Sequence, residues 1–345
     1  MGTARVVFLV LDGLPPDVAG PDVTPVLHEW CRASGTSPHT VPAVLPASTY
    51  PNHATFVTGV PPTVHGIVGN HVRGDDGRFR PARKVGPRVP TIFDAAGAEG
   101  RTSAVVVSDQ DLIGVMGARS AGVHWPEGGV VPDGAVTDAH GYLDDDVTLP
   151  HLLDALSGDA DLVVGHLNAP DTAGHVRGPE GASEVYRSTD ARLAPIRSAI
   201  ESRADDTVTI IVSDHAMEPV TERAPVDLSG ALEGTGLTWF PEGSAALVYG
   251  EHDDLAGLLA GTSGVEGVQV LAPDLHLVWG DAGRWLCFAG IDGEPGMHGS
   301  PRTARQLAAV VGTNAVVSDL DTRVAAPGFD ATSWFGELCR LLGLT

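Results

Sequence analysis

The chain has 345 residues, enough for one large α/β domain that carries an insertion and buries a substantial core. Its 21 lysines and arginines stand against 44 acidic residues, and the formal net charge of -23 argues against a nucleic-acid polymer or an anionic membrane surface as partner. Because Lys84 is the only lysine, the sequence offers almost no material for a Schiff base or a Walker-type phosphate loop.

Apolar runs and helical patterns alternate along the chain. We predict buried parallel strands at residues 5–11, 103–107, 161–167, 207–212 and 307–311. Helical patterns lie at residues 23–33, 90–96, 149–156, 182–203 (with a break at Pro195) and 331–342. Strands that alternate with helices predict an α/β fold, namely a doubly wound, mostly parallel sheet flanked by helices.

Residues 225–290 have a different pattern, with shorter strands and turns around a helix near residues 253–259. We interpret this stretch as a small antiparallel lobe inserted into a single catalytic domain that spans residues 1–345. Trp279 and Trp285 are expected in the core of the lobe.

The cysteines and the apolar segments indicate the cellular environment. Cys31, Cys287 and Cys339 are odd in number and widely spaced, so we expect buried reduced thiols and no disulfide framework. No signal peptide is visible, and no stretch approaches the ~18 apolar residues that a membrane span needs. The sequence therefore predicts a cytoplasmic protein without membrane contact.

Carboxylates follow three of the predicted strands, and histidines accompany them. Ligands of parallel α/β sheets bind beyond the carboxyl ends of the strands, so the side chains at these strand ends are expected at one place. Asp171 and His175 are four residues apart and would share one face of a helix. Three carboxylates with three histidines are what two zinc ions need when each ion keeps positions open for substrate. The six residues are Asp12, Asp171, His175, Asp214, His215 and His298.

A hydroxyl residue, Thr49, lies where a proline-rich loop turns into a short helical stretch at residues 54–58. The first N–H groups of a helix lack intrahelical partners, and with the helix dipole they favour an anion beside such a hydroxyl. Thr49 is therefore a candidate nucleophile toward a phosphate. The alternative is that Ser48 or Thr49 only caps the helix.

Together these segments resemble the alkaline phosphatase superfamily, and most closely its nucleotide pyrophosphatase/phosphodiesterase branch, over nearly the whole chain. Thr49 in Thr-Tyr-Pro-Asn-His matches the nucleophile of the family, and Asn70 matches the asparagine that follows its His-Gly-Ile motif. The resemblance implies an alkaline-phosphatase-like core and two divalent metal ions, with zinc favoured and manganese or iron as alternatives. The implied ligands are Asp171, His175 and His298 for one ion, and Asp12, Asp214, His215 and the Thr49 hydroxyl for the other.

The resemblance also implies an activity. The expected enzyme hydrolyses phosphodiester or pyrophosphate bonds of a small phosphorylated substrate through a phospho-threonine on Thr49. Asn70 would donate its side-chain amide to a non-bridging oxygen of the phosphoryl group.

Three positions bear on the substrate. Tyr50 keeps the aromatic residue that follows the nucleophile in the family, whereas His166 replaces a second aromatic residue. We expect both side chains to bind the substrate, in a stacking slot that is only half preserved. The acidic residue that commonly precedes the last histidine of the family is absent before His298.

Other activities of the same site stay open. Residues 62–67 and 89–93 also resemble phosphonoacetate hydrolase, but the lysines with which that enzyme grips the substrate carboxylate are replaced here by Asp109-Gln110-Asp111. A phosphomonoesterase would want extra positive charge, and the nearest arginine in the sequence is Arg73. A catalytically silent binding or scaffold protein on the same fold is a more remote alternative.

Overall fold

The computed structural model describes residues 4–74, 76–203, 206–313 and 315–345. Within these ranges, the central sheet has seven strands in the order β2-β15-β8-β1-β7-β5-β6. Neighbouring strands from β8 through β1, β7 and β5 to β6 run parallel, so the predicted fold class is confirmed. The strands are β1 (Arg5–Leu11), β2 (His39–Pro42), β5 (Ser103–Val107), β6 (Val123–Trp125), β7 (Leu162–Leu167), β8 (Thr207–Val212) and β15 (Arg305–Val311).

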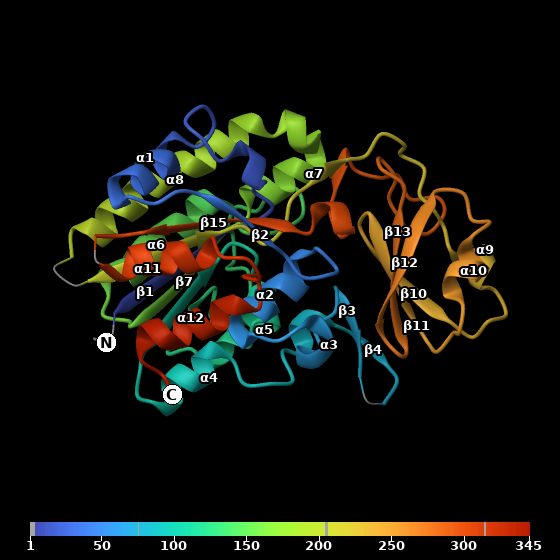
Figure 1. The fold of residues 1–345 in the computed structure, drawn as a ribbon, viewed down its shortest axis with the longest axis horizontal. Helices are drawn as coiled ribbons and strands as arrows, with labels where there is room; N and C mark the ends of the chain where they lie inside the picture. Colours follow the sequence, from blue (N-terminus) through green and yellow to red (C-terminus); the bar gives the residue numbers. More distant parts are fainter. Residues whose placement is uncertain (1–3, 75, 204–205, 314) are drawn as a thin grey trace.

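Two layers of helices cover the sheet (Figure 1). Every residue of β1 is buried, and alternate side chains enter the two apolar clusters on opposite faces. Phe8, for example, packs against α2 and α12, whereas Leu9 belongs to the cluster of α1, α6 and α8. The helices of this second layer are α1 (Pro25–Ser34), α6 (Asp145–Ser157) and α8 (Ser183–Glu201), and those of the first are α2 (Thr49–Thr58), α4 (Ile92–Ala98), α11 (Ala315–Val324) and α12 (Ser333–Leu342).

Shorter elements surround the carboxyl edge of the parallel strands. The two-stranded pair of β9 and β14 lies near α7, which follows β7. A second pair, β3 with β4, forms a hairpin after α3. The elements are α3 (Pro62–His65), β3 (His71–Arg73), β4 (Phe79–Pro81), α5 (Leu112–Val115), α7 (Ala169–Gly181), β9 (Glu218–Pro219) and β14 (Gly296–Met297).

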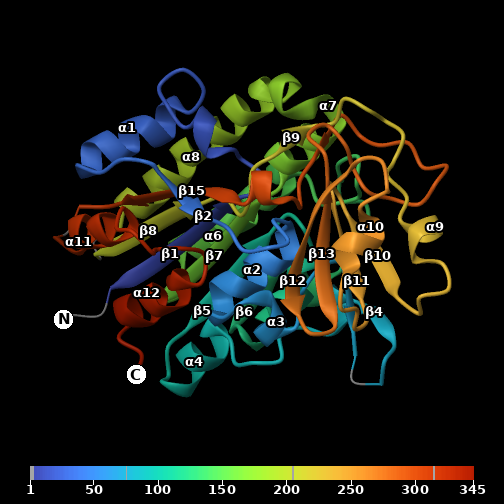
Figure 2. The same ribbon diagram turned by 45° about the vertical axis from the view of Figure 1, so that its right-hand side comes forward.

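The lobe, residues 225–290, lies at the end of the molecule toward which the parallel strands point (Figures 1 and 2). Its antiparallel sheet has the order β10-β11-β13-β12 and its own apolar cluster. An antiparallel sheet is thus present where it was expected, while the domain boundaries stay a prediction. The elements are α9 (Ser229–Leu232), β10 (Thr238–Glu242), β11 (Ala245–Tyr249), α10 (Leu255–Leu259), β12 (Val265–Ala272) and β13 (Leu275–Gly280).

Two sequence predictions about the core are wrong. The strand at residues 307–311 was expected to be parallel, but β15 is antiparallel to both β8 and β2. His298 lies at the carboxyl edge of the parallel strands, and the short connection through η5 (Pro301–Thr303) starts β15 at the same edge, so the strand must run back. Pro195 does not break α8, because it lies on the exposed side of the helix, where the carbonyl group left without its donor can bind water.

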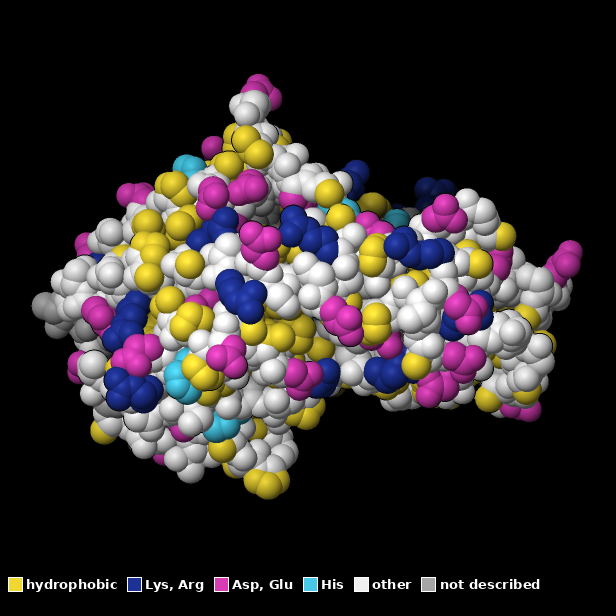
Figure 3. Space-filling view, turned by 90° about the horizontal axis from the view of Figure 1, so that it is seen from above, with side chains coloured by type: hydrophobic (Ala, Val, Ile, Leu, Met, Phe, Trp, Pro, Cys, Tyr) yellow, Lys and Arg dark blue, Asp and Glu magenta, His cyan; other side chains and the backbone are white. Residues whose placement is uncertain are grey.

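The cysteines, the helix lengths and the surface charges bear on the environment of the protein. Cys31 and Cys287 are buried and Cys339 is half-buried, and all three are free thiols. In the part of the chain that the structure describes, the helices are too short or too polar to cross a bilayer. Figure 3 shows basic side chains interspersed with acidic ones on the face seen from above, so charges of both signs are mixed there. The cytoplasmic location stays a prediction.

Candidate active site

The ends of β1 and β8 bring three predicted metal ligands together. Asp12 and Asp214 lie just beyond these hydrogen-bonded neighbouring strands. The Nε2 atom of His215 lies 3.7 Å from Asp12 Oδ1 and 3.3 Å from Asp214 Oδ2, and all three side chains are fully buried. Asp214 Oδ1 accepts hydrogen bonds from the N–H groups of Gly13 and His215, both at 3.0 Å. Those bonds orient the carboxylate, so its other oxygen faces the imidazole.

A second set of predicted ligands lies beside the first. Asp171 and His175 are one turn apart on α7, and the Nε2 atoms of His175 and His298 lie 3.5 and 3.6 Å from Asp171 Oδ1. The Nδ1–H of His175 donates to the carbonyl oxygen of Gly296 at 2.9 Å, which leaves Nε2 as the lone-pair donor of the ring. Gly13 has a φ of 63°, and a Cβ there would lie 2.9 Å from the Asp171 Cα, so only glycine permits this approach.

The chemistry of both sets fits divalent metal ions. In each set the candidate ligand atoms lie within 4.8 Å of one another. Asp12 Oδ1, Asp171 Oδ1 and Asp214 Oδ2 are buried and, among the described residues, have no hydrogen-bond partner. Burial, with the charges of Asp214 and Asp171, raises the pKa of Asp12, while burial and His215 lower the pKa of His298. Buried carboxylates that lie this close together require a cation to be ionised together.

Thr49 is the first residue of α2, and its hydroxyl faces the first set of ligands. Thr49 Oγ1 lies 3.2 Å from His215 Nε2. Ser48 is the N-cap of α2, but its side chain makes no capping hydrogen bond, and its buried hydroxyl has no partner among the described residues. Simple helix capping therefore does not account for the two hydroxyls. His53 supports the turn, because its Nδ1–H donates to the carbonyl oxygen of Thr49 at 2.9 Å.

A cavity of about 280 Å³ opens beside Thr49 and the second ligand set, between the core and the lobe. Asn70, the predicted donor to a phosphoryl oxygen, is one of the residues that line it. Among the described residues, those that line the cavity include neither lysine nor arginine. They are Ser48, Thr49, Tyr50, Asn70, His140, Tyr142, Asp171, His175, Pro241, Glu242, Gly243, Trp285, Leu286, Cys287, Met297 and His298.

The two expected substrate-binding residues differ in position. Tyr50 lines the cavity, and its hydroxyl donates to Asp111 Oδ2 at 3.3 Å. His166 is fully buried on β7, with Nε2 2.8 Å from Asp12 Oδ2 and Nδ1 facing the N–H of Asp109 at 3.5 Å. The expected contact of His166 with substrate therefore does not fit the structure, because the side chain points beneath the site and supports Asp12.

Sequence reasoning missed several residues of the site. Glu294 accepts a hydrogen bond from His140 at 2.9 Å, and its other oxygen lies 3.3 Å from His175 Nδ1. These two histidines lower the pKa of Glu294. The sequence did contain a signal for Glu294. The family commonly has an acidic residue directly before the last histidine, and this chain has one four positions before His298 instead. Trp285, expected in the core of the lobe, instead packs with Val220, Cys287 and Met297 and lines the cavity.

Residues 6–262 match the family model described as type I phosphodiesterase / nucleotide pyrophosphatase. The chain belongs to this family. Membership in the type I phosphodiesterase/nucleotide pyrophosphatase family confirms the resemblance that the sequence motifs indicated.

Individual members of the family are distant relatives. Ectonucleotide pyrophosphatase/phosphodiesterase family member 1 of Rattus norvegicus is 25% identical over 214 residues, which cover 56% of this chain and 22% of that protein. An uncharacterized pyrophosphatase/phosphodiesterase of Schizosaccharomyces pombe is 27% identical over 242 residues, 64% of this chain and 46% of that protein. The matched segment thus spans less than half of each of these relatives.

Solved structures of other proteins share the fold. Murine ectonucleotide pyrophosphatase/phosphodiesterase 5 superposes with a TM-score of 0.74 at 17% identity, covering 99% of this chain and 95% of that chain. Phosphonoacetate hydrolase from Sinorhizobium meliloti, in complex with phosphonoformate, gives a TM-score of 0.69 at 19% identity, covering 98% and 96%. At these identities the likeness establishes the fold.

Proposed function

We propose that the protein is a dimetal hydrolase of phosphodiester or pyrophosphate bonds that works through a phospho-threonine on Thr49. The observation that carries the proposal is the position of the Thr49 hydroxyl, 3.2 Å from His215 Nε2 at the start of α2 and beside two complete sets of metal-ligand residues. A helix N-terminus favours the anion that such a hydroxyl would attack. Family membership supports hydrolysis of phosphoester bonds.

The proposed reaction has two displacements at phosphorus. Thr49 Oγ loses its proton and attacks phosphorus, the bond to the leaving oxygen breaks, and that oxygen departs with the bonding electrons. Water then hydrolyses the phospho-threonine and restores the hydroxyl. Asn70 and the first backbone N–H groups of α2 would bind the non-bridging oxygens, whose negative charge grows during each displacement.

Zinc is the proposed metal, with manganese or iron as alternatives, because imidazole with carboxylate suits these ions. Bound ions would supply Lewis acidity that offsets the phosphoryl charge and lowers the pKa of the attacking hydroxyl. Asp171, His175 and His298 would hold one ion. Asp12, Asp214, His215 and the Thr49 hydroxyl would hold the other.

The cavity favours a diester, or a pyrophosphate whose attacked phosphoryl group carries a single negative charge, over a phosphomonoester dianion or a carboxylated phosphonate. Phosphonates with a carboxylate and phosphomonoester dianions need a further cation, and the described residues that line the cavity offer no lysine or arginine. Arg83 does not supply this cation, because its guanidinium group already donates to the carboxylate of Asp111 at 2.6 Å and is neutralised by it. The aromatic rings of Tyr50, Tyr142 and Trp285 offer surface to a flat leaving group. Murine ectonucleotide pyrophosphatase/phosphodiesterase 5 has been solved with AMP in an inactive form.

The test is Thr49→Ala assayed on an aryl phosphodiester, an aryl phosphomonoester and a phosphonate with zinc-loaded protein. We expect the variant to keep its fold and its metal but to lose turnover by several orders of magnitude. Thr58→Ala is the matched control, because it removes another buried hydroxyl of α2 that donates to Ala54 at 2.7 Å. It should cost about 1 kcal/mol of stability and leave turnover near the parental rate. A folded, metal-loaded Thr49→Ala protein with near-parental turnover would refute the covalent mechanism.

Metal dependence is tested separately. Protein purified without chelator should contain about two transition-metal ions per chain by elemental analysis. Removal of the ions by a chelator should abolish hydrolysis, and zinc or manganese should restore it. Active metal-free protein would refute the dimetal reading.

A further inference from the structure

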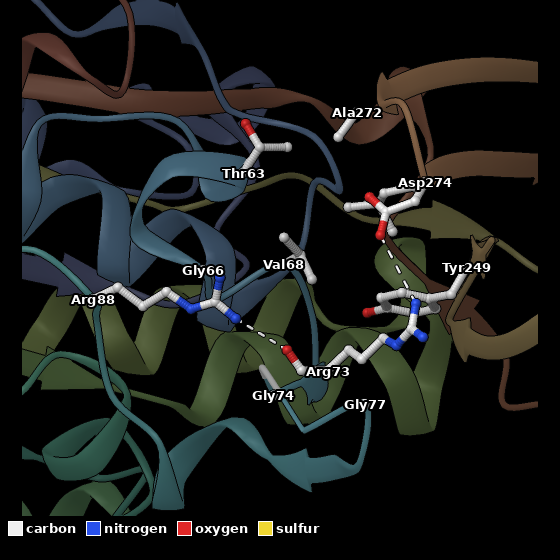
Figure 4. Close-up of a pocket in the computed structure, with 11 residues that line it drawn as sticks. Thr63, Gly66, Val68, Arg73, Gly74, Gly77, Arg88, Tyr249, Ala272 and Asp274 are labelled. Carbon is white, nitrogen blue, oxygen red and sulfur yellow. Dashed lines mark hydrogen bonds and ion pairs between the residues drawn. The ribbon is translucent and has the colours of Figure 1, made fainter. Parts of the chain in front are cut away.

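The lobe holds the segment that carries Asn70. From the lobe, the hydroxyl of Tyr249 donates to the carbonyl oxygen of His71 on this segment at 3.1 Å. Arg73 of the segment forms an ion pair with Asp274 of the lobe at 3.8 Å. Figure 4 shows Tyr249, Asp274 and Arg73 together at a cavity of about 340 Å³ between α3, the β3–β4 hairpin and the lobe. The inserted sheet therefore contacts this segment at both His71 and Arg73.

Glu242, the last residue of β10, makes the contact nearest to the catalytic residues. Its side chain is 3% exposed, and Oε1 accepts a hydrogen bond from the backbone N–H of Asn70 at 2.8 Å. A Cβ at position 69 would lie 2.3 Å from that oxygen, so Gly69 is required for the carboxyl group to come this close. Glu242 also lines the cavity that contains Thr49.

The second oxygen of Glu242 is also relevant to its role. Oε2 is buried and lacks a hydrogen-bond partner among the described residues. A buried polar atom without a partner destabilises the fold, so its presence at a cavity wall points to a role in the site. Burial raises the pKa of Glu242 to about 8, so the carboxyl group is protonated near neutral pH and Oε2 can carry a donor proton.

We propose that Glu242 is a positioning residue through which the lobe fixes Asn70 for its contact with the phosphoryl oxygen. The inference rests on the proposed function of Asn70. The backbone N–H of Asn70 is anchored to Oε1, and the carbonyl oxygen of Asn70 accepts from the N–H of Ala82 at 2.9 Å. With its peptide groups held on both sides, the side chain of Asn70 has only its own two torsions left to adjust.

A substitution series separates this role from a general structural one. Glu242→Leu removes the acceptor at similar volume, and we expect kcat to fall about 10- to 100-fold while KM changes less than about 3-fold, because Asn70 acts mainly in the transition state. Glu242→Gln keeps an acceptor for Asn70 and a donor at the second position, and should restore most of kcat. Tyr249→Phe is the matched control, since it removes another hydrogen bond between the same lobe and segment; it should lower kcat less than about 3-fold.

A double-mutant cycle identifies the residue through which Glu242 acts. Asn70→Ala should lower kcat about 100- to 1000-fold, and adding Glu242→Leu to it should cause no further loss beyond about 2-fold. An equal loss from Glu242→Leu in both backgrounds, or failure of Glu242→Gln to restore kcat, would overturn the proposal.

Hydrogen–deuterium exchange gives a readout that needs no turnover. Glu242→Leu should accelerate amide exchange in residues 66–74, and Glu242→Gln should not. Unchanged exchange in the leucine variant would overturn the proposal even in an active enzyme. If the parent hydrolyses none of the substrates but the leucine variant still shows accelerated exchange, the anchoring of Asn70 is kept and only the proposed function is rejected.

Discussion

His166→Leu tests whether a buried histidine beneath the site controls metal binding. The substitution places an apolar side chain of comparable size on β7 and removes the donor that lies 2.8 Å from Asp12 Oδ2. That hydrogen bond holds one carboxylate oxygen, so Oδ1, which has no hydrogen-bond partner among the described residues, is left to face the site. Without it the carboxylate is free to rotate about its Cβ–Cγ bond. Loss of such an outer hydrogen bond commonly lowers metal affinity ~10–100-fold, and we expect a decrease of that size.

The assay is a chelator-competition titration with zinc, combined with thermal unfolding to show that the variant is folded. Both groups of the pair are fully buried, so an orphaned Asp12 oxygen should also cost about 1–3 kcal/mol of stability. His276→Leu is the matched control, because His276 is a buried histidine of β13 in the lobe and is not part of the candidate metal-ligand groups. It should leave zinc affinity at the parental value. Parental zinc affinity in a folded His166→Leu protein would refute the supporting role of His166.

Three further predictions concern the metal sets and the lobe. His175→Ala should empty one metal position preferentially, so elemental analysis should find metal content reduced toward one ion per chain, and unchanged content would remove His175 from the ligand set. Gly13→Ala should lower the melting temperature and weaken metal binding, because the added Cβ would lie 2.9 Å from the Asp171 backbone at a φ of 63°; unaltered values for both would contradict the close approach. In metal-free protein, burial raises the pKa of Glu242 to about 8 from the ordinary 4.5, so the folded state holds this proton more tightly than the unfolded state. The parent should therefore lose stability as pH rises from about 4.5 to about 8, and Glu242→Gln should be more stable than the parent by a few kcal/mol at pH 8; parallel denaturant curves across this range would show that the pKa is not raised.

The sequence predicted the central strands well because they are continuous apolar runs that end at an aspartate. The predicted bounds of β1, β5 and β8 coincide with the observed ones, and the strand ends bring Asp12 and Asp214 together. Local patterns of composition are enough for such strands, since burial on both faces of a parallel sheet leaves few other choices of residue.

Other features depend on partners that are distant in the chain. Comparison with the family motif placed His166 where relatives have an aromatic residue. It could not show that the side chain points toward Asp12. The direction of β15 follows from where the chain arrives at the sheet, which a strand pattern does not contain. Glu242 and Glu294 contact Asn70 and His175 across separations of more than one hundred residues, and they lie where the sequence resembles the family least or lacks its motif.

The antiparallel strand β15 also affects the order in which the chain can fold during synthesis. It covers the side of β8 that faces away from β1, and it is made about one hundred residues later than β8. Until the ribosome releases residues 305–311, the apolar strand β8 is an open edge with unpaired backbone groups, which is a template for association with other chains. A polypeptide that stops before this point lacks β15 and leaves the edge of β8 unpaired, next to the central strand β1. C-terminal truncation is therefore expected to make the protein aggregate into inclusion bodies. During synthesis, this edge would need protection by chaperones until β15 is complete.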